Sequence, residues 1–285
     1  MLSSAWPAPA KLNLFLHITG QRPDDGYHLL QTVFQFIELA DEIDFTVLAS
    51  DTVQRSSSMP GVDADNDLVV RAARCLKEKT GCKLGVDINV NKIIPAGGGL
   101  GGGSSDAATT LVALNELWQT GLSPEELACI GLSLGADVPV FVHGYAAWAE
   151  GVGENLTPIE PEESVYLVVH PGCSVATATV FGTSDLTRNT PPITIRDFLE
   201  RGGVNDCESV VRKHYREVAN ALNWLEEFAP AKLTGTGACL FAPFPDALEA
   251  TAVKEKLPVN WQGYVVKGKN RSPLLERLAD ERSGN

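Results

Sequence analysis

This 285-residue chain is poor in basic side chains and has no long apolar run. Lysine and arginine together number 23 against 36 aspartates and glutamates, so the formal net charge is −13. A nucleic-acid surface needs clustered lysine and arginine, and no such cluster occurs along the sequence. No apolar stretch approaches the roughly 18 residues of a membrane-spanning helix. We therefore expect neither a nucleic acid nor a membrane as a partner.

The patterns typical of an exported protein are also missing. Residues 1–7 have neither the basic segment nor the apolar core of a signal peptide. The six cysteines form no Cys-x-x-Cys pair and no spacing typical of zinc ligands. A reducing compartment fits such cysteines best. We therefore predict a cytoplasmic protein.

Glycine, in contrast, is concentrated between residues 95 and 105, which read Pro-Ala-Gly-Gly-Gly-Leu-Gly-Gly-Gly-Ser-Ser. A predicted strand at 86–90 precedes this segment, and a helical pattern follows it. Glycine permits close approach of a ligand to the backbone, and a helix N-terminus offers unpaired N–H groups with a partial positive charge. The segment therefore predicts a phosphate-binding loop. We expect Ser104 or Ser105 to cap the helix and Asp106 to lie in its first turn.

Two familiar phosphate-binding patterns do not fit this loop. A P-loop requires Gly-Lys-Ser/Thr at its end, and here Gly103 is followed by two serines and Asp106. The Rossmann pattern is matched formally by Gly97, Gly99 and Gly102, but a single helix follows where that fold needs a second strand and an acidic residue.

Other segments show the expected local structure. Ser123-Pro124-Glu125-Glu126 is a capping box that begins a helix ending at Gly135. The apolar run 138–142, directly after Asp137, predicts a buried strand. Residues 207–228 predict one long helix. Loosely alternating helices and strands beyond residue 165 predict an α+β sandwich, with a domain boundary near the Pro- and Glu-rich segment 156–163.

Three separated segments have the composition of a chemical site: Lys11 with Asn13, the glycine loop with Asp137 downstream, and residues 234–237. Together with the Asp25-Gly26-Tyr27-His28 turn, they resemble the GHMP kinases, the superfamily of galactokinase, homoserine kinase, mevalonate kinase and phosphomevalonate kinase. Within it, the Pro-Ala-Lys-Leu-Asn start and the Tyr27-His28 pair resemble the branch that acts on diphosphocytidyl-methylerythritol. The resemblance implies a two-domain α/β (α+β) fold. Residues 1–158 would form an ATP-binding domain like domain 2 of ribosomal protein S5, and residues 159–285 a ferredoxin-like domain.

The resemblance implies ATP-dependent phosphorylation of the 2-hydroxyl of that substrate, a step of the non-mevalonate route to isoprenoids. Asp137 would be the base for the attacking hydroxyl, and Lys11 would lie beside it and stabilise developing charge. Mg²⁺ would bridge the β- and γ-phosphates. The implied ATP-binding residues are Lys92, Pro95, Ala96, Gly97, Gly98, Gly99, Leu100, Gly101, Gly102, Gly103, Ser104 and Ser105.

For the cytidine base, the resemblance implies Tyr27 and His28, with Phe181 on the opposite face. Asn13 would bind the substrate's hydroxyls or orient Lys11. The second domain would bring a loop of Thr234, Gly235, Thr236 and Gly237 to the phosphates. The metal ligand stays open among Ser104, Ser105, Asp106 and the nucleotide itself.

This chain departs from the family pattern at two positions. Asp106 stands where the family commonly has asparagine, and Asp67 aligns with an asparagine of the adenine pocket. An extra residue in Asp24-Asp25 lengthens a turn. Two alternatives to the implied activity are another GHMP kinase acting on a small alcohol and a non-catalytic ligand sensor of the same fold.

Overall fold

The computed structural model describes residues 5–24, 26–57 and 63–284. Asp25, which belongs to the predicted turn, lies outside the described residues. The same holds for residues 1–4 of the N-terminal segment and for residues 58–62.

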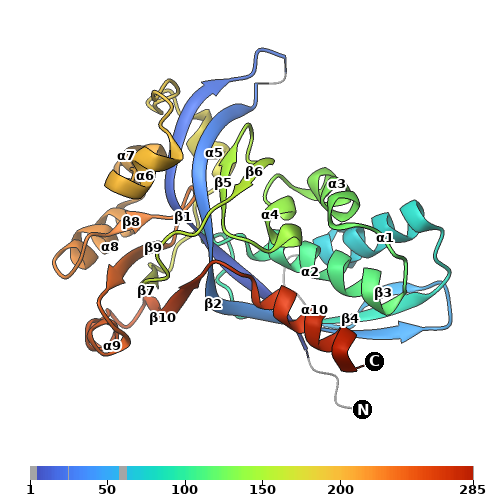
Figure 1. Ribbon diagram of the computed structural model, residues 1–285. Helices are drawn as coiled ribbons and strands as arrows, with labels where there is room; N and C mark the ends of the chain where they lie inside the picture. Colours follow the sequence, from blue (N-terminus) through green and yellow to red (C-terminus); the bar gives the residue numbers. More distant parts are fainter. Residues whose placement is uncertain (1–4, 25, 58–62, 285) are drawn as a thin grey trace.

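A long antiparallel hairpin runs through the molecule (Figure 1). It consists of β1 (Trp6–Gln21) and β2 (His28–Leu48), of 16 and 21 residues. β2 runs without interruption from His28 to Leu48. Most residues of β1 are buried, so the hairpin lies in the core rather than on the surface. Because β2 pairs with strands of both halves of the chain, it connects them into one sheet.

The ten-stranded sheet has the order β3-β4-β2-β10-β7-β9-β8, with β1 and β5 also paired to β2 and β6 paired to β5. Its other strands are β3 (Val53–Arg55), β4 (Gly85–Asn91), β5 (Ala147–Glu150), β6 (Asn155–Pro158), β7 (Val165–His170), β8 (Lys232–Leu233), β9 (Leu240–Phe244) and β10 (Gln262–Lys269).

The helices form two groups on either side of the hairpin (Figure 1). The first half has the 3₁₀ turn η1 (Ala64–Asn66), α1 (Leu68–Thr80), α2 (Gly102–Leu117), α3 (Pro124–Leu134) and α4 (Val138–His143). The second half has α5 (Thr177–Gly182), α6 (Ile195–Arg201), α7 (Asp206–His214), α8 (Arg216–Glu226) and α9 (Ala247–Lys254). Residues 105–115 of α2 are all buried, which makes α2 the central helix of the first core. The predicted capping box at Ser123 and the end of α3 at Gly135 are both confirmed.

The C-terminal helix α10 (Pro273–Gly284) returns to the first half of the chain. Its Arg277 guanidinium lies 4.6 Å from the ring centre of Trp6, and Arg282 pairs with Glu116 of α2 at 2.8 Å. Helix α10 therefore packs beside β1 and α2 of the first half. The predicted domain boundary after residue 158 stays a prediction.

Two predicted elements are wrong. Residues 138–142, predicted as a strand, belong to helix α4. A buried apolar run of this length is compatible with a strand or a helix. Pro139 near the start and Gly144, with its left-handed conformation, at the C-cap favour a short helix. The single helix predicted at 207–228 is two helices, α7 and α8, separated by Tyr215 in an extended conformation. The hydrophobic residues keep their helical spacing across Tyr215, so the sequence pattern does not reveal the break between the two helices.

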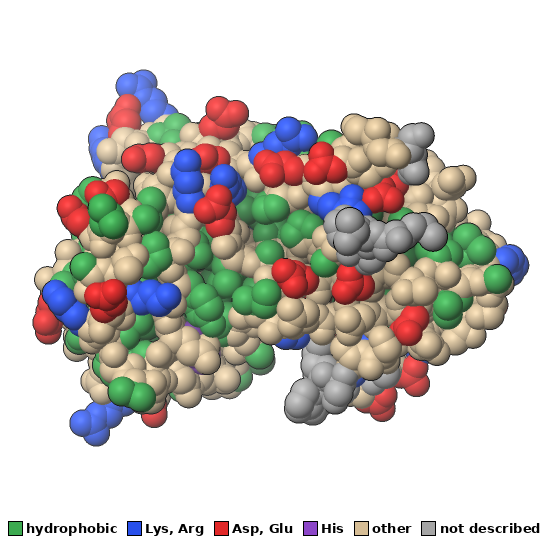
Figure 2. All heavy atoms as spheres, turned by 90° about the horizontal axis from the view of Figure 1, so that it is seen from below, with side chains coloured by type: hydrophobic (Ala, Val, Ile, Leu, Met, Phe, Trp, Pro, Cys, Tyr) green, Lys and Arg blue, Asp and Glu red, His purple; other side chains and the backbone are tan. Residues whose placement is uncertain are grey.

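On the face shown in Figure 2, acidic and basic side chains of the described residues are interspersed. Among the helices of the described residues, none has both the length and the apolar character needed to cross a bilayer.

Candidate active site

A cavity of about 1020 Å³ lies where the hairpin, the glycine loop and the second half of the chain meet. Most of the residues predicted for the site line it: Lys11, Asn13, Tyr27, His28, Lys92, residues 95–104, Asp137, Phe181, Gly235 and Thr236. Ser105, Thr234 and Gly237 do not line it. The fold thus brings together residues as far apart in the chain as Lys11 and Thr236.

Irregular pairing of β1 with β2 makes room for the site. The register shifts between Pro9 and Lys11 and again between Asn13 and Leu16. In this stretch the Lys11 N–H donates to the Leu100 carbonyl, and the Asn13 N–H donates to Thr234 Oγ1, each at 3.0 Å. Such bulges bend a strand and redirect its side chains. The strand is thereby tied to both loops of the site through its backbone.

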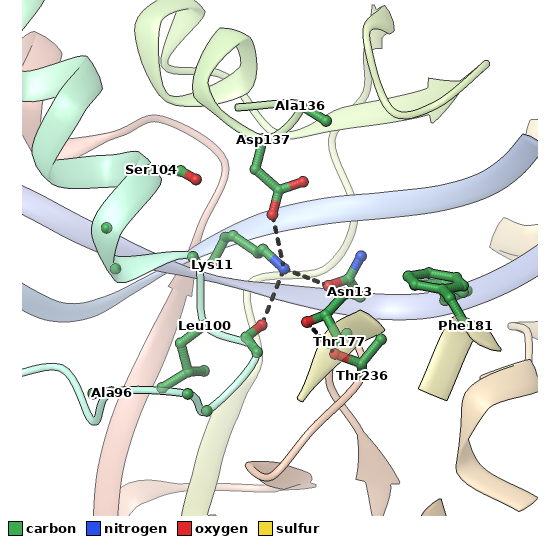
Figure 3. A pocket seen from close by; sticks show the side chains of 18 of the residues that line it. Lys11, Asn13, Ala96, Leu100, Ser104, Ala136, Asp137, Thr177, Phe181 and Thr236 are labelled. Atoms are coloured by element: carbon green, nitrogen blue, oxygen red, sulfur yellow. Dashed lines mark hydrogen bonds and ion pairs between the residues drawn. The ribbon is translucent and has the colours of Figure 1, made fainter. Parts of the chain in front are cut away.

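Lys11 occupies the centre of this arrangement (Figure 3). Its side chain is only 4% exposed. The Nζ atom donates to Asn13 Oδ1 at 2.5 Å and to the Gly99 carbonyl at 3.0 Å, and it lies 3.7 Å from Asp137 Oδ2. The predicted proximity of Lys11 and Asp137 is confirmed. Asn13 contacts Lys11, and its contact with the substrate's hydroxyls stays a prediction.

Burial lowers the pKa of Lys11 below its ordinary value, and the Asp137 carboxylate opposes this effect. Asp137 lies just before α4, and 36% of its side chain is exposed. The pair therefore combines a cation shielded from water with a carboxylate that a ligand in the cavity can reach. Charge beside a shielded cation interacts with it more strongly than in water.

The glycine loop follows a path that side chains would obstruct. Gly99 has φ +72°, and a Cβ there would lie 2.4 Å from the Thr234 carbonyl oxygen. Gly101 has φ +75°, and a Cβ there would lie 2.7 Å from the Phe141 ring and 3.2 Å from Lys11 Cε. Both positions thus require glycine, because L-residues avoid positive φ and the space is already filled.

The start of α2 differs from the prediction. Gly101 is the N-cap residue, and no side chain caps the helix. The expectation that Ser104 or Ser105 caps the helix is wrong, because both serines lie inside α2, after Gly102 and Gly103. The expectation that Asp106 lies in the first turn is also wrong, because it follows that turn. The N–H groups at the start of α2 thus have no side-chain acceptor, which suits them for binding an anion from the cavity.

Asp106 instead belongs to an ionic cluster with Lys92 and Asp41, in which both carboxylates are buried. Lys92 Nζ lies 2.7 Å from Asp106 Oδ2 and also pairs with Asp41 Oδ2. Burial lowers the pKa of Lys92, but the carboxylates of Asp106 and Asp41 outweigh it and raise that pKa above its ordinary value. Burial raises the pKa of Asp106 to about 7, against the influence of Lys92 and together with that of Asp41. Sequence analysis did not identify Asp41, because a single carboxylate at this point of the chain carries no distinguishing signal.

Asp67, at the other departure from the family pattern, has a local structural role. Its Oδ1 accepts a hydrogen bond from Val69 N at 3.1 Å as the N-cap of α1, and its Oδ2 pairs with Arg55. Both carboxylate oxygens are thus in use, although the residue also borders the cavity.

The loop at residues 234–237 is buried and divides into a supporting part and a part that borders the cavity. Thr234 is fully buried and accepts from the Asn13 N–H. Thr236 borders the cavity, and its hydroxyl lies 2.9 Å from that of Thr177, as Figure 3 shows. Thr177, at the start of α5, was not identified from sequence.

Tyr27, His28 and Phe181 all line the cavity. The His28 and Phe181 rings are stacked, with centroids 4.9 Å apart and planes at 26°. Tyr27 is 59% exposed. Arg188, which sequence analysis did not identify, donates from Nε to His28 Nε2 at 3.0 Å.

Comparisons with known proteins agree with this arrangement. The family model of the GHMP kinases N terminal domain matches residues 67–145, and that of the GHMP kinases C terminal domain matches residues 187–262. The chain is 59% identical over 280 residues to a 4-diphosphocytidyl-2-C-methyl-D-erythritol kinase of Alkalilimnicola ehrlichii, covering 98% of this chain and 96% of the relative. It is 55% identical over 273 residues to the kinase of the same name from Nitrosococcus oceani, covering 96% and 97%.

Solved structures show the same fold. A crystal structure of 4-(cytidine 5'-diphospho)-2C-methyl-D-erythritol kinase superposes with a TM-score of 0.81 at 30% identity, covering 93% of this chain and 98% of that one. A mevalonate kinase with 14% identity superposes with a TM-score of 0.69, covering 94% and 99%, and supports the fold alone. The predicted two-domain GHMP kinase fold is confirmed. The chain belongs to the GHMP kinase family, within its 4-diphosphocytidyl-2-C-methyl-D-erythritol kinases.

Proposed function

We propose that this protein transfers the γ-phosphoryl group of ATP to the 2-hydroxyl of 4-diphosphocytidyl-2-C-methyl-D-erythritol. The observation that carries the proposal is the placement of Lys11 and Asp137 opposite the glycine loop, on the wall of one cavity. Phosphoryl transfer depends mainly on positioning and on stabilising the charge of the transferred group. A shielded cation, an accessible carboxylate and a loop of backbone donors can supply both.

The glycine loop and the start of α2 would bind the phosphates of ATP. The fit rests on two features: the uncapped N–H groups at Gly102, Gly103 and Ser104, and the space that a Cβ would fill at Gly99 and Gly101. An anion beside these groups satisfies donors that otherwise lack side-chain partners, and the helix dipole favours it.

Asp137 would accept the proton of the substrate's hydroxyl. Its exposure leaves its oxygens within reach of a ligand, and the Lys11 ammonium lies 3.7 Å from one of them. Lys11 would also stabilise the charge that develops on the transferred group. Asn13 would keep the Lys11 ammonium directed toward the reacting atoms through their hydrogen bond.

Mg²⁺ would accompany ATP and reduce the charge repulsion between its phosphates and the incoming oxygen. Groups of three or more potential ligand side chains do not occur among the described residues. This fits an ion held largely by phosphate oxygens and water, as is common for Mg²⁺. Ser104 and Asp106 both border the cavity and are the candidate protein ligands, while the hydroxyl of Ser105 is buried.

The cytidine base would bind at the far end, among Tyr27, His28 and Phe181. Aromatic side chains offer flat apolar faces, and His28 adds a hydrogen-bonding edge. Phe181 and His28 contact each other in this structure, so a base between Tyr27 and Phe181 requires some rearrangement of these rings.

The proposal is tested by measuring ADP formation with Mg²⁺, ATP and the cytidine substrate for wild type and Asp137→Asn. We expect substrate-dependent turnover whose kcat falls at least about 100-fold in the variant, the usual loss when a general base is removed. Asp185→Asn is the matched control, because that side chain has a similar exposure of 41% and does not border the cavity. Turnover of an undecorated small alcohol without turnover of the cytidine compound would instead favour another GHMP kinase activity. Nucleotide binding without any turnover would favour the sensor.

A further inference from the structure

Arg188 lies between α5 and α6, and its guanidinium donates hydrogen bonds to three backbone carbonyls. Its Nη2 donates to the carbonyls of Phe181 at 2.8 Å and Thr183 at 2.7 Å, and its Nη1 donates to that of Leu186 at 3.1 Å. These bonds fix the guanidinium plane. The Nε–H then points at His28 Nε2, at 3.0 Å, from the second half of the chain to the first.

This contact determines which nitrogen of His28 carries the proton. A guanidinium has only N–H donors and is always charged, so the nitrogen that faces it must act as the acceptor. Nε2 is therefore unprotonated, and the neutral ring carries its hydrogen on Nδ1. Burial lowers the pKa of His28, and the positive charge of Arg188 lowers it further, which agrees with a neutral ring. No hydrogen-bond partner for Nδ1 occurs among the described residues.

Arg188 also fixes the geometry of the rings. Through the Phe181 carbonyl it holds α5, and through Nε it holds His28, the first residue of β2. The two rings that it anchors are stacked and border the same cavity. One guanidinium thus sets both the position of the aromatic platform and the polarity of the adjacent hydrogen-bonding edge.

We infer that Arg188 is a positioning residue that makes His28 a hydrogen-bond donor toward the bound base and thereby selects cytosine over uracil. N3 of cytosine is an acceptor and suits a ring N–H, whereas N3 of uracil carries a hydrogen and would face it donor to donor. The opposite tautomer would reverse this preference. The inference rests on the proposed function, in which His28 contacts the base.

The first test is the tautomer itself, in the wild-type protein without ligand. Nitrogen-15 NMR of labelled histidine at pH 7, with His28 assigned by comparison with His28→Gln, should show a protonated Nδ1 and an unprotonated Nε2. A protonated Nε2, or a fully protonated ring, would overturn the inference. This measurement requires no catalytic activity and no variant of Arg188.

The second test compares kcat/KM for the cytidine substrate and its uridine counterpart. We expect Arg188→Met to reduce the preference for cytidine by about tenfold or more, the effect of one misplaced hydrogen bond. Arg188→Lys, which keeps a donor for Nε2, should retain more of the preference. Arg196→Met is the matched control, because Arg196 is 86% exposed, pairs with Glu200 on α6 and does not border the cavity. Thermal melting of each variant shows whether it is folded.

The outcomes separate the two proposals. An active wild type whose Arg188→Met variant keeps both the tautomer and the preference would overturn the inference alone. A wild type that does not turn over the cytidine substrate would overturn the proposed function and, with it, the selection of the base.

Discussion

The substitution of Gly99 by alanine tests the packing of the glycine loop against the second half of the chain. A Cβ at this position would lie 2.4 Å from the Thr234 carbonyl oxygen and 3.1 Å from that of Gly237. Both neighbours are backbone atoms, so no side chain can rotate away. The loop, or the segment that holds Thr234, would have to move.

Two terms contribute to the expected loss of stability. A non-glycine residue in the left-handed region costs about 1–2 kcal/mol, and forcing extra volume into a filled space typically costs about 1–3 kcal/mol. The reduced freedom of the unfolded chain returns up to about 1 kcal/mol. We therefore expect Gly99→Ala to lower the free energy of unfolding by about 2–4 kcal/mol, or the melting temperature by roughly 3–7 °C.

Gly103→Ala is the matched control in the same loop-to-helix segment. Gly103 lies inside α2, without positive φ, and a Cβ there would meet only Leu68 Cδ1 at the ordinary distance of 3.4 Å. Alanine should stabilise this position by up to about 1 kcal/mol, because it favours the helix. Thermal unfolding followed by circular dichroism measures both. If Gly99→Ala melted at the wild-type temperature, the close approach of the two segments would be wrong.

Two further predictions concern the buried charges and the thiols. The pKa of Asp106 is raised from 3.8 to about 7 in the folded protein. Between these pH values the folded state keeps a proton that the unfolded chain has lost. The free energy of unfolding should therefore fall by on the order of 3 kcal/mol as the pH rises through this window. Urea unfolding at pH 5 and pH 8 should show a smaller fall for Asp106→Asn, and an equal fall in the variant would contradict the assignment. Burial raises the pKa of the Cys207 thiol to about 12, whereas Cys129 is exposed. A thiol reagent at pH 8 should therefore modify Cys129 rapidly and Cys207 only when the protein unfolds. Rapid labelling of Cys207, located by mass spectrometry, would show that α7 is not packed as described.

Local patterns predicted local structure where one signal dominated. The capping box at Ser123 has the side-chain and backbone partners that its sequence requires, so it was readable without the fold. The strand at 86–90 and the helix that follows the glycines were equally clear. The apolar run at 138–142 was ambiguous, because its burial is compatible with either a strand or a single helical turn, and packing decides between them.

The sequence by itself determined the glycine loop, the placement of Lys11, Asn13 and Asp137 in recognisable motifs, and through them the family. Only the tertiary structure decided which side chains meet. Asp41 and Lys92 are 51 positions apart, and Arg188 and His28 are 160 positions apart. Neither pair leaves a periodic trace in the sequence. Their contacts depend on how β2 crosses from one half of the chain to the other, and a path of that length is set by the packing of the whole sheet.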